Sequence, residues 1–252
     1  MMIFSTKNPS GVITSLIPSA DFTVTRIDGL TPPQVNINTT QSANLDGSVF
    51  NSAAARDRNI VINMAVHSPA EVNRLKLYAA APIKKLCTFY AKTAARDVKI
   101  LGYIEACEVN IFDQIETAQI SAICPDPWFS AVTDETVNIS NTFTDFTNAG
   151  DIPCGAEFEL TVSADELDVV IENGEYNFFE INYNFLAGDK ILINTKRGIK
   201  SVILRRGSTL TNLLNYVNSG STWLQIDGGT NRIKTSENVA GTVTFTPLFS
   251  GV

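Results

Sequence analysis

Residues 31–51 read TPPQVNINTTQSANLDGSVFN, and this polar stretch constrains the organisation of the chain more than any other. Pro32 and Pro33 force an extended backbone at its start. Asp46-Gly47 between extended flanks is a strong signal for a hairpin turn. The two flanks contain too few apolar residues to build a core of their own. The stretch from Pro32 to Asn51 is therefore either an ordinary exposed loop or an arm that finds its partner on another subunit.

Around this stretch, the first half of the chain reads as extended strands and one helix. Ser68-Pro69-Ala70-Glu71 is a good helix start, because Ser caps, Pro fits the first turn and Glu reaches back. Val72, Leu75 and Ala79 follow at helical spacing, which predicts that this face lies on a sheet. Pro82 ends the helix. The stretches expected to be extended are 12–17, 22–27, 58–66, 87–92, 98–109 and 117–124.

The second half reads as strands and turns only, apart from a possible short helix at Leu210–Val217. Phe158–Val162 alternates between apolar and polar residues, and Asn173-Gly174 predicts a hairpin whose second strand begins at Tyr176. Short strands with turns every ~8–12 residues are typical of a β-sandwich. The sequence thus predicts a β-rich protein, with an α+β domain followed by a sandwich.

The boundary between these domains is expected near residue 130. Residues 1–130 carry 11 basic and 11 acidic side chains, whereas residues 131–252 carry 8 and 15, so the net charge of −7 belongs to the second half. Cys124-Pro125-Asp126-Pro127 ends an extended run with two prolines, which terminate strand pairing. A polar stretch follows, from Thr133 to Asp151. We therefore predict domains at 1–130 and 131–252.

Composition excludes several classes of function. The acidic pI of about 4.8 provides no basic surface for nucleic acid. No apolar run approaches the ~18 residues of a membrane span, and the first residues do not resemble a secretion signal. We therefore expect no nucleic-acid or membrane partner and assembly in a cytoplasm.

Few residues suggest catalysis or metal binding. His67, the single histidine, stands where a strand gives way to the helix, and we expect it to pack at that boundary. Cys87, Cys107, Cys124 and Cys154 are far apart without a CxxC motif, which predicts free thiols rather than a metal site. Glu157 and Glu159 share one face of a strand that is expected to face solvent. We therefore predict no catalytic residue, metal or cofactor.

Several separated fragments resemble the phage distal tail protein family in order and spacing. They are IDGLTPP (27–33), DGSVFN (46–51), RNI (58–60), PIKK (82–85), GYIE (102–105), ICPDP (123–127), AGD (187–189), NTKRG (194–198), GSTWL (220–224) and FTPLFSGV (245–252). The resemblance implies a structural protein of a phage tail tip, in which six copies form a ring. The N-terminal domain would build the ring, and the C-terminal domain would be a galectin-like β-sandwich outside it.

The same resemblance implies the partners and the interface of the ring. The stretch from Pro32 to Asn51 would be a hairpin arm that embraces the neighbouring copy. The ring would join the tail tube protein to a tail-associated lysin or tail-tip protein, and receptor-binding proteins are a further possible partner. Interface candidates are Pro32, Pro33, Val35, Ile37, Asp46, Gly47, Val49, Phe50 and Arg58.

Two other functions compete with this hypothesis. The acidic domain could bind a host-surface carbohydrate, for which Trp223 is a weak candidate. Galectin-type recognition, however, uses a His and Arg set around a Trp, and the second half contains no His. A hydrolase with paired carboxylates would need two of them to converge in a cleft.

Overall fold

The computed structural model describes residues 2–41, 43, 46–112, 114–174 and 177–252, and it divides the chain into two compact units. Unit 1 comprises Met1–Val132 and Phe249–Val252, and unit 2 comprises Thr133–Leu248. The last four residues thus pack with the first unit, whereas the sequence placed them in the second domain. Tyr176, the expected first residue of a strand, lies outside the described residues, as do residues 42, 44 and 45 of the expected arm.

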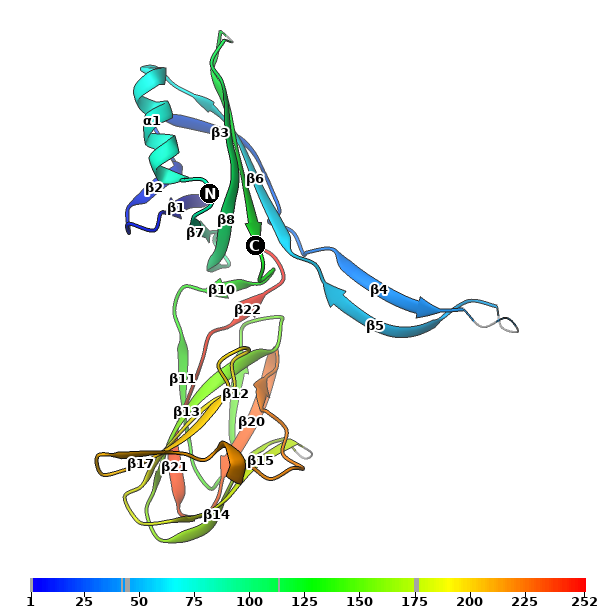
Figure 1. The fold of residues 1–252 in the computed structure, drawn as a ribbon, viewed down its shortest axis with the longest axis vertical. Coiled ribbons are helices and arrows are strands. Elements are labelled where there is room, and N and C mark those ends of the chain that lie inside the picture. The colour runs from blue at the N-terminus through cyan, green and yellow to red at the C-terminus, as the bar shows by residue number, and fades with distance from the viewer. Residues whose placement is uncertain (1, 42, 44–45, 113, 175–176) are drawn as a thin grey trace. The chain divides into compact units, whose positions relative to one another are not determined.

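Unit 1 is built on an antiparallel sheet of the order β2-β1-β7-β8-β9-β6-β3, with β10 added to β8 (Figure 1). Its elements are β1 (Ile3–Lys7), β2 (Ile13–Ile17), β3 (Phe22–Asp28), β4 (Val35–Thr40), β5 (Val49–Ala55), β6 (Arg58–Val66), α1 (Ala70–Ala80), β7 (Leu86–Lys92), β8 (Asp97–Asn110), β9 (Thr117–Cys124) and β10 (Phe129–Ala131). Among the described strands, β4 and β5 pair only with each other.

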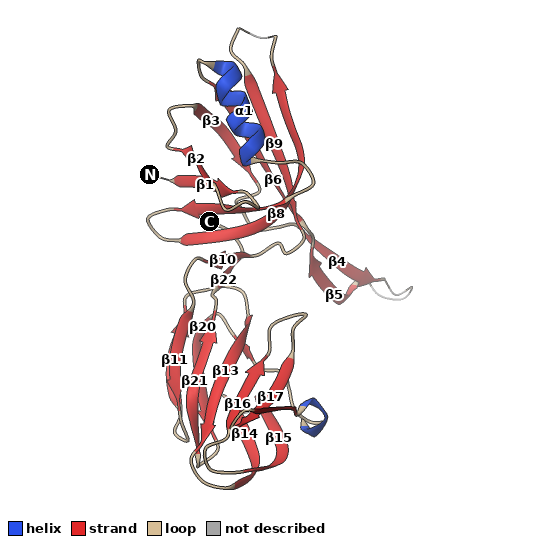
Figure 2. Ribbon diagram, turned by 60° about the vertical axis from the view of Figure 1, so that its left-hand side comes forward, coloured by secondary structure: helices blue, strands red, loops and turns tan. Residues whose placement is uncertain are grey.

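The core of unit 1 lies on the face of the sheet that α1 covers (Figure 2). Along β6, every second side chain from Arg58 to Val66 is buried. The helix exists as expected, but a different face is buried: Asn73, Leu77 and Ala80 point inward, while Val72 and Leu75 are exposed. The amide of Asn73 donates to the backbone oxygen of His67 at 3.0 Å, which satisfies this buried polar group. The helix starts after Pro69 without a side-chain cap from Ser68.

Unit 2 consists of two antiparallel sheets that share one apolar core. One sheet has the order β11-β21-β13-β16-β17-β18, with β19 beside β13, and the other has the order β12-β20-β14-β15. Its elements are β11 (Glu135–Ile139), β12 (Thr144–Asn148), β13 (Cys154–Val162), β14 (Glu166–Asn173), β15 (Asn177–Phe185), β16 (Lys190–Asn194), β17 (Ser201–Arg206), β18 (Thr209–Asn212), the 3₁₀ turn η1 (Leu214–Tyr216), β19 (Gln225–Ile226), β20 (Gly229–Thr235) and β21 (Val239–Phe245); β22 (Leu248–Phe249) follows where the chain returns to unit 1.

The β-rich character predicted from the sequence is confirmed, and β11 and β12 are among the strands that were not predicted. β11 and β12 occupy the polar stretch after Thr133, where only Ile139 and Asn148 are buried among their ten residues. The buried Asn148 donates to the backbone oxygen of Asp227 at 3.1 Å. Polar composition therefore hid two strands whose positions are fixed by pairing with β21 and β20. None of the helices among the described residues is long and apolar enough to cross a membrane.

The cysteines are unpaired, and burial suppresses their ionisation. Cys87, Cys124 and Cys154 are buried and Cys107 is half-buried. Loss of solvation raises the pKa of Cys124 to about 12, although the nearby Arg58 guanidinium opposes the shift. Burial likewise raises the pKa values of Cys107 and Cys154 to about 11.

We expect these thiols to be nearly inert toward Ellman's reagent in the folded protein. A thiol of pKa about 11 is ionised at pH 8 in about one molecule in a thousand. All four cysteines should react within seconds once denaturant unfolds the chain. Because the unfolded chain releases these protons near pH 8.5 and the folded chain does not, the free energy of unfolding should decrease as the pH rises from about 8.5 toward 11. Rapid reaction of the native protein at pH 8 would contradict this prediction.

Candidate assembly interface

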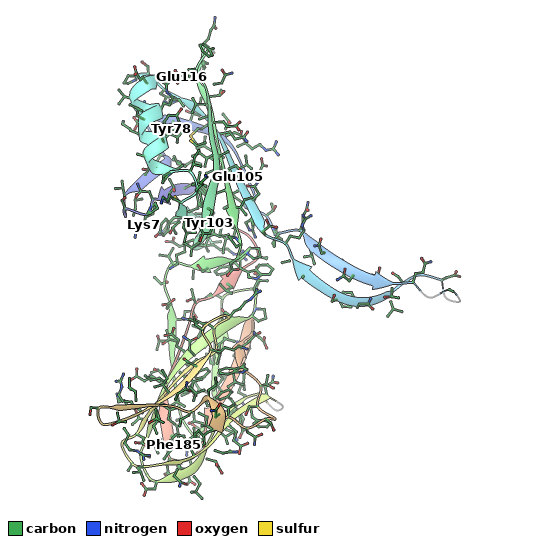
Figure 3. The ribbon with its side chains drawn as sticks, viewed as in Figure 1. Lys7, Tyr78, Tyr103, Glu105, Glu116 and Phe185 are labelled. Atoms are coloured by element: carbon green, nitrogen blue, oxygen red, sulfur yellow. The ribbon has the colours of Figure 1, made fainter. Side chains whose placement is uncertain are left out.

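The arm consists of β4 and β5, and all but one of its strand side chains are exposed. Only Ala55, the last residue of β5, is partly buried. Figure 3 shows their side chains on a two-stranded ribbon that leaves the sheet of unit 1, with no other described element of unit 1 beside it. A two-stranded ribbon without packing is marginally stable in water at best. The outer edges of both strands also carry backbone groups that no described strand pairs with.

The register of the ribbon gives it one apolar face. Val35 lies opposite Ala55, Ile37 lies opposite Ala53, and a bulge then places Thr39 opposite Phe50. Because paired residues share a face, these six side chains lie together. Ile37 and Phe50 are 63% and 62% exposed, respectively, which is unusual for large apolar side chains on one surface.

The opposite face of the ribbon is mainly polar. Asn38 donates to the hydroxyl of Ser52 at 3.2 Å, and Asn51 donates to the hydroxyl of Thr40 at 2.5 Å. Val49 pairs with Thr40 and lies on this second face. Among the interface candidates, Val35, Ile37 and Phe50 therefore lie together, and Val49 lies apart from them.

The root of the arm is held by the guanidinium of Arg58. Its Nη1 donates to the backbone oxygens of Gly29 and Thr31 at 2.5 and 2.6 Å, and its Nε donates to that of Pro127 at 2.7 Å. Nη2 donates to the backbone oxygen of Ser250 at 2.6 Å. Arg58 is only 3% exposed, and burial lowers its pKa. Although the sequence placed Arg58 among the interface candidates, the structure shows that its donors bind its own chain.

The turn before the arm leaves no room for a larger residue than glycine. Gly29 has a φ of +86°, a conformation that L side chains rarely adopt, and a Cβ there would collide with the backbone oxygen of Asn59. Pro32 and Pro33 follow and, together with Gln34 and Arg58, line a pocket of about 410 Å³ at the root. At the far end, Gly47 takes a φ of +91°, as a tight turn requires, next to the exposed Asp46. The interface candidates thus lie in three places: at the root of the arm, along its two strands and at its turn.

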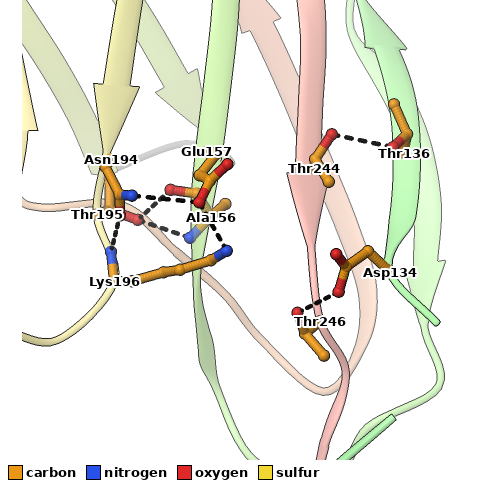
Figure 4. Close-up of polar contacts among 9 residues, drawn as sticks. All are labelled: Asp134, Thr136, Ala156, Glu157, Asn194, Thr195, Lys196, Thr244 and Thr246. Atoms are coloured by element: carbon orange, nitrogen blue, oxygen red, sulfur yellow. Dashed lines mark hydrogen bonds and ion pairs between the residues drawn. The ribbon is translucent and has the colours of Figure 1, made fainter. Parts of the chain in front are cut away.

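The residues considered as catalytic candidates form hydrogen bonds or ion pairs with other residues of the chain. The ring of His67 makes two contacts of 2.8 Å, with the hydroxyl of Thr23 through Nε2 and the backbone oxygen of Ala20 through Nδ1. Glu157 and Glu159 are exposed on β13 and form ion pairs with Lys196 and Lys190 at 2.8 and 3.3 Å. Figure 4 shows Glu157 also accepting from Asn194, on a face where threonine hydroxyls join β11 to β21. Within the described ranges, no group of three or more His, Cys, Asp or Glu residues is arranged to hold a metal ion.

Residues 149–249 match the family model of the siphovirus-type tail component, C-terminal domain. Most of unit 2 therefore resembles a domain of siphovirus tail components. The match covers nearly all of its core strands from β13 to β21. The resemblance to phage distal tail proteins noted from the sequence is thereby confirmed.

One solved structure shares the fold of the whole chain. The Dit protein of SPP1, described as a paradigm of the hub adsorption apparatus in phages infecting Gram-positive bacteria, matches with a TM-score of 0.72 and 14% identity, covering 98% of this chain and 99% of that one. The baseplate of phage P2 in its activated conformation with Ca matches with a TM-score of 0.47 and 11% identity, over 97% of this chain and 98% of that one. No curated protein sequence matches the chain.

Proposed function

We propose that six copies of this protein form a closed ring through unit 1 and that the arm of each copy lies along the next. The ring joins the tail tube to the baseplate or tail-tip proteins, with unit 2, a galectin-like sandwich, on its outside. Assembly takes place in the host cytoplasm, before the protein becomes part of the virion. The likeness of the fold to the SPP1 hub protein over the whole chain supports this adaptor role.

The amphipathic arm is the observation that carries the proposal. Its apolar face is exposed on the single chain, and its strand edges are free to add main-chain hydrogen bonds to another sheet. The arm and the surface that receives it are different patches, so the contact is head-to-tail. Such contacts end in a ring when the rotation between copies closes.

The test is the mass of the purified protein by light scattering across a concentration series, with negative-stain images of the largest species. Six chains of 27.4 kDa give about 164 kDa, and class averages should show six-fold symmetry. Added tail tube protein provides a template if the chain alone stays monomeric. A monomer throughout the series, with and without the tube protein, would refute the ring.

Salt should promote this assembly. All of the net charge of −7 lies in unit 2, while the rest of the chain is neutral. Six acidic units around one ring repel each other. In 0.1 M salt this repulsion is largely screened between charges more than about 10 Å apart. We therefore expect the ring population to increase as NaCl is raised, measured by light scattering at fixed protein concentration. A ring population that falls with salt would mean that attraction between charges holds the copies together.

A further inference from the structure

A groove of about 640 Å³ lies on unit 2, where β14, β15 and β17 meet η1. Tyr183 of β15 and Tyr216 of η1 meet edge to face in its wall, with 4.9 Å between the ring centroids and 78° between the ring planes. Tyr183 is packed against the core, which holds Tyr216 in place, and Tyr216 is 47% exposed. The groove therefore has a rigid aromatic surface that remains open to solvent.

Next to the tyrosines, the groove presents polar side chains that are not engaged. Asp168 and Asn182 lie directly opposite each other on β14 and β15, and both are exposed. Neither their side chains nor the hydroxyls of the two tyrosines bond to another residue in the described part of the chain. The carboxylate of Asp168 supplies hydrogen-bond acceptors, and the amide of Asn182 supplies both donors and an acceptor.

The guanidinium of Arg206 is fixed at the end of the groove. Asp189, which is 2% exposed, accepts from its Nε at 2.9 Å and from its Nη2 at 2.6 Å. Nη2 also donates to the backbone oxygen of Asn184 at 2.9 Å. The hydrogen bonds from Arg206 hold the pKa of Asp189 below its usual range, so the ion pair persists through neutral pH. Nη1 takes no part in these bonds and remains available as a donor in a preorganised position.

We propose that this groove binds a neutral saccharide. A sugar ring offers an apolar C–H face that packs on an aromatic ring such as Tyr216, and it carries neighbouring hydroxyls that match the spacing of planar carboxylate and amide groups. Asp189 already neutralises Arg206, so Asp168 leaves the groove with a negative charge. That charge disfavours phosphates and acidic sugars as ligands.

The other sites considered for a sugar lack free groups of this kind. The ring centroids of Trp223 and Phe179 are 5.0 Å apart. The ammonium of Lys200 also lies 5.0 Å from the centroid of the Trp223 ring. Both neighbours occupy space against the indole, which packs on the core. On the sheet face of β13, Glu157 is already bound to Lys196. A ligand there would have to break existing ion pairs, whereas in the groove it would displace only water.

The experiment is saturation-transfer NMR of the full chain with the methyl glycosides of glucose, galactose and N-acetylglucosamine, and with glucuronic acid as an anionic probe. We expect saturable binding of at least one neutral glycoside in the millimolar range and weaker binding of glucuronic acid. Asp168→Asn, which preserves size, should weaken binding about tenfold. Tyr216→Ala should abolish binding, and Tyr216→Phe should retain most of it.

Asp145→Asn on β12 is the matched control, because it also neutralises an exposed carboxylate of unit 2 but lies outside the groove. Thermal melting of each variant checks that unit 2 stays folded. Absence of binding to all three neutral glycosides, or binding that Asp168→Asn and Tyr216→Ala leave unchanged, would overturn the proposal. These measurements do not depend on the ring, so either result leaves the adaptor function untouched.

Discussion

Replacing Ile37 and Phe50 together by asparagine is expected to abolish the ring and leave the single chain folded. Both side chains lie on the apolar face of the arm and are more than half exposed in the single chain. Burying such side chains in a contact contributes about 3 kcal/mol in total, so each contact between copies should weaken by roughly a hundredfold. Light scattering at a concentration where the wild type is a ring measures this loss.

The matched control changes the other face of the same ribbon. Asn36→Ser and Thr40→Ser replace two polar residues by smaller polar ones, and Thr40→Ser keeps the hydroxyl that accepts from Asn51. This control should assemble like the wild type. Because β4 and β5 pair with no other strand that the structure describes, both double variants should melt at the wild-type temperature. A ring that survives Ile37→Asn with Phe50→Asn would show that the copies meet through another surface.

The sequence revealed the arm because its turn chemistry is local. Two adjacent prolines and Asp46-Gly47 mark the ends of the hairpin, whatever the rest of the chain does. The division into two faces was not visible, because the bulge beyond Asn38 changes which residues lie opposite each other. Alternation alone would have separated Phe50 from Ile37. The structure was needed to show that they share a face.

Helix α1 shows the opposite limitation. The sequence predicted the helix but not which of its faces is buried, since two different faces carry apolar residues. Val72 and Leu75 form the more apolar stripe, yet Asn73 and Leu77 are buried. A polar residue enters a core when a specific partner satisfies it, and that partner for Asn73 is the backbone oxygen of His67. Such a pairing depends on tertiary geometry that periodicity does not contain.

The role of Arg58 was hidden for the same reason, because its four partners come from three separate parts of the chain. We expect Arg58→Ala to destabilise unit 1 by about 4 kcal/mol, since hydrogen bonds to a charged group contribute ~1.5–3 kcal/mol each and are not additive. The change leaves four carbonyl oxygens without their donor. It also removes the guanidinium that lies 4.6 Å from the centre of the Phe129 ring.

Urea unfolding followed by fluorescence measures this loss in unit 1 alone if Trp223 is first replaced by phenylalanine. Trp128 then remains as the single tryptophan, and it lies in unit 1. Arg56→Ala is the control, because Arg56 is exposed two residues away and its side chain bonds to no described residue. Arg58→Lys should recover little, since an ammonium lacks the planar fork that reaches four carbonyls. A loss below about 1 kcal/mol for Arg58→Ala would mean that water replaces the guanidinium and that the turn at Gly29 holds the root by itself.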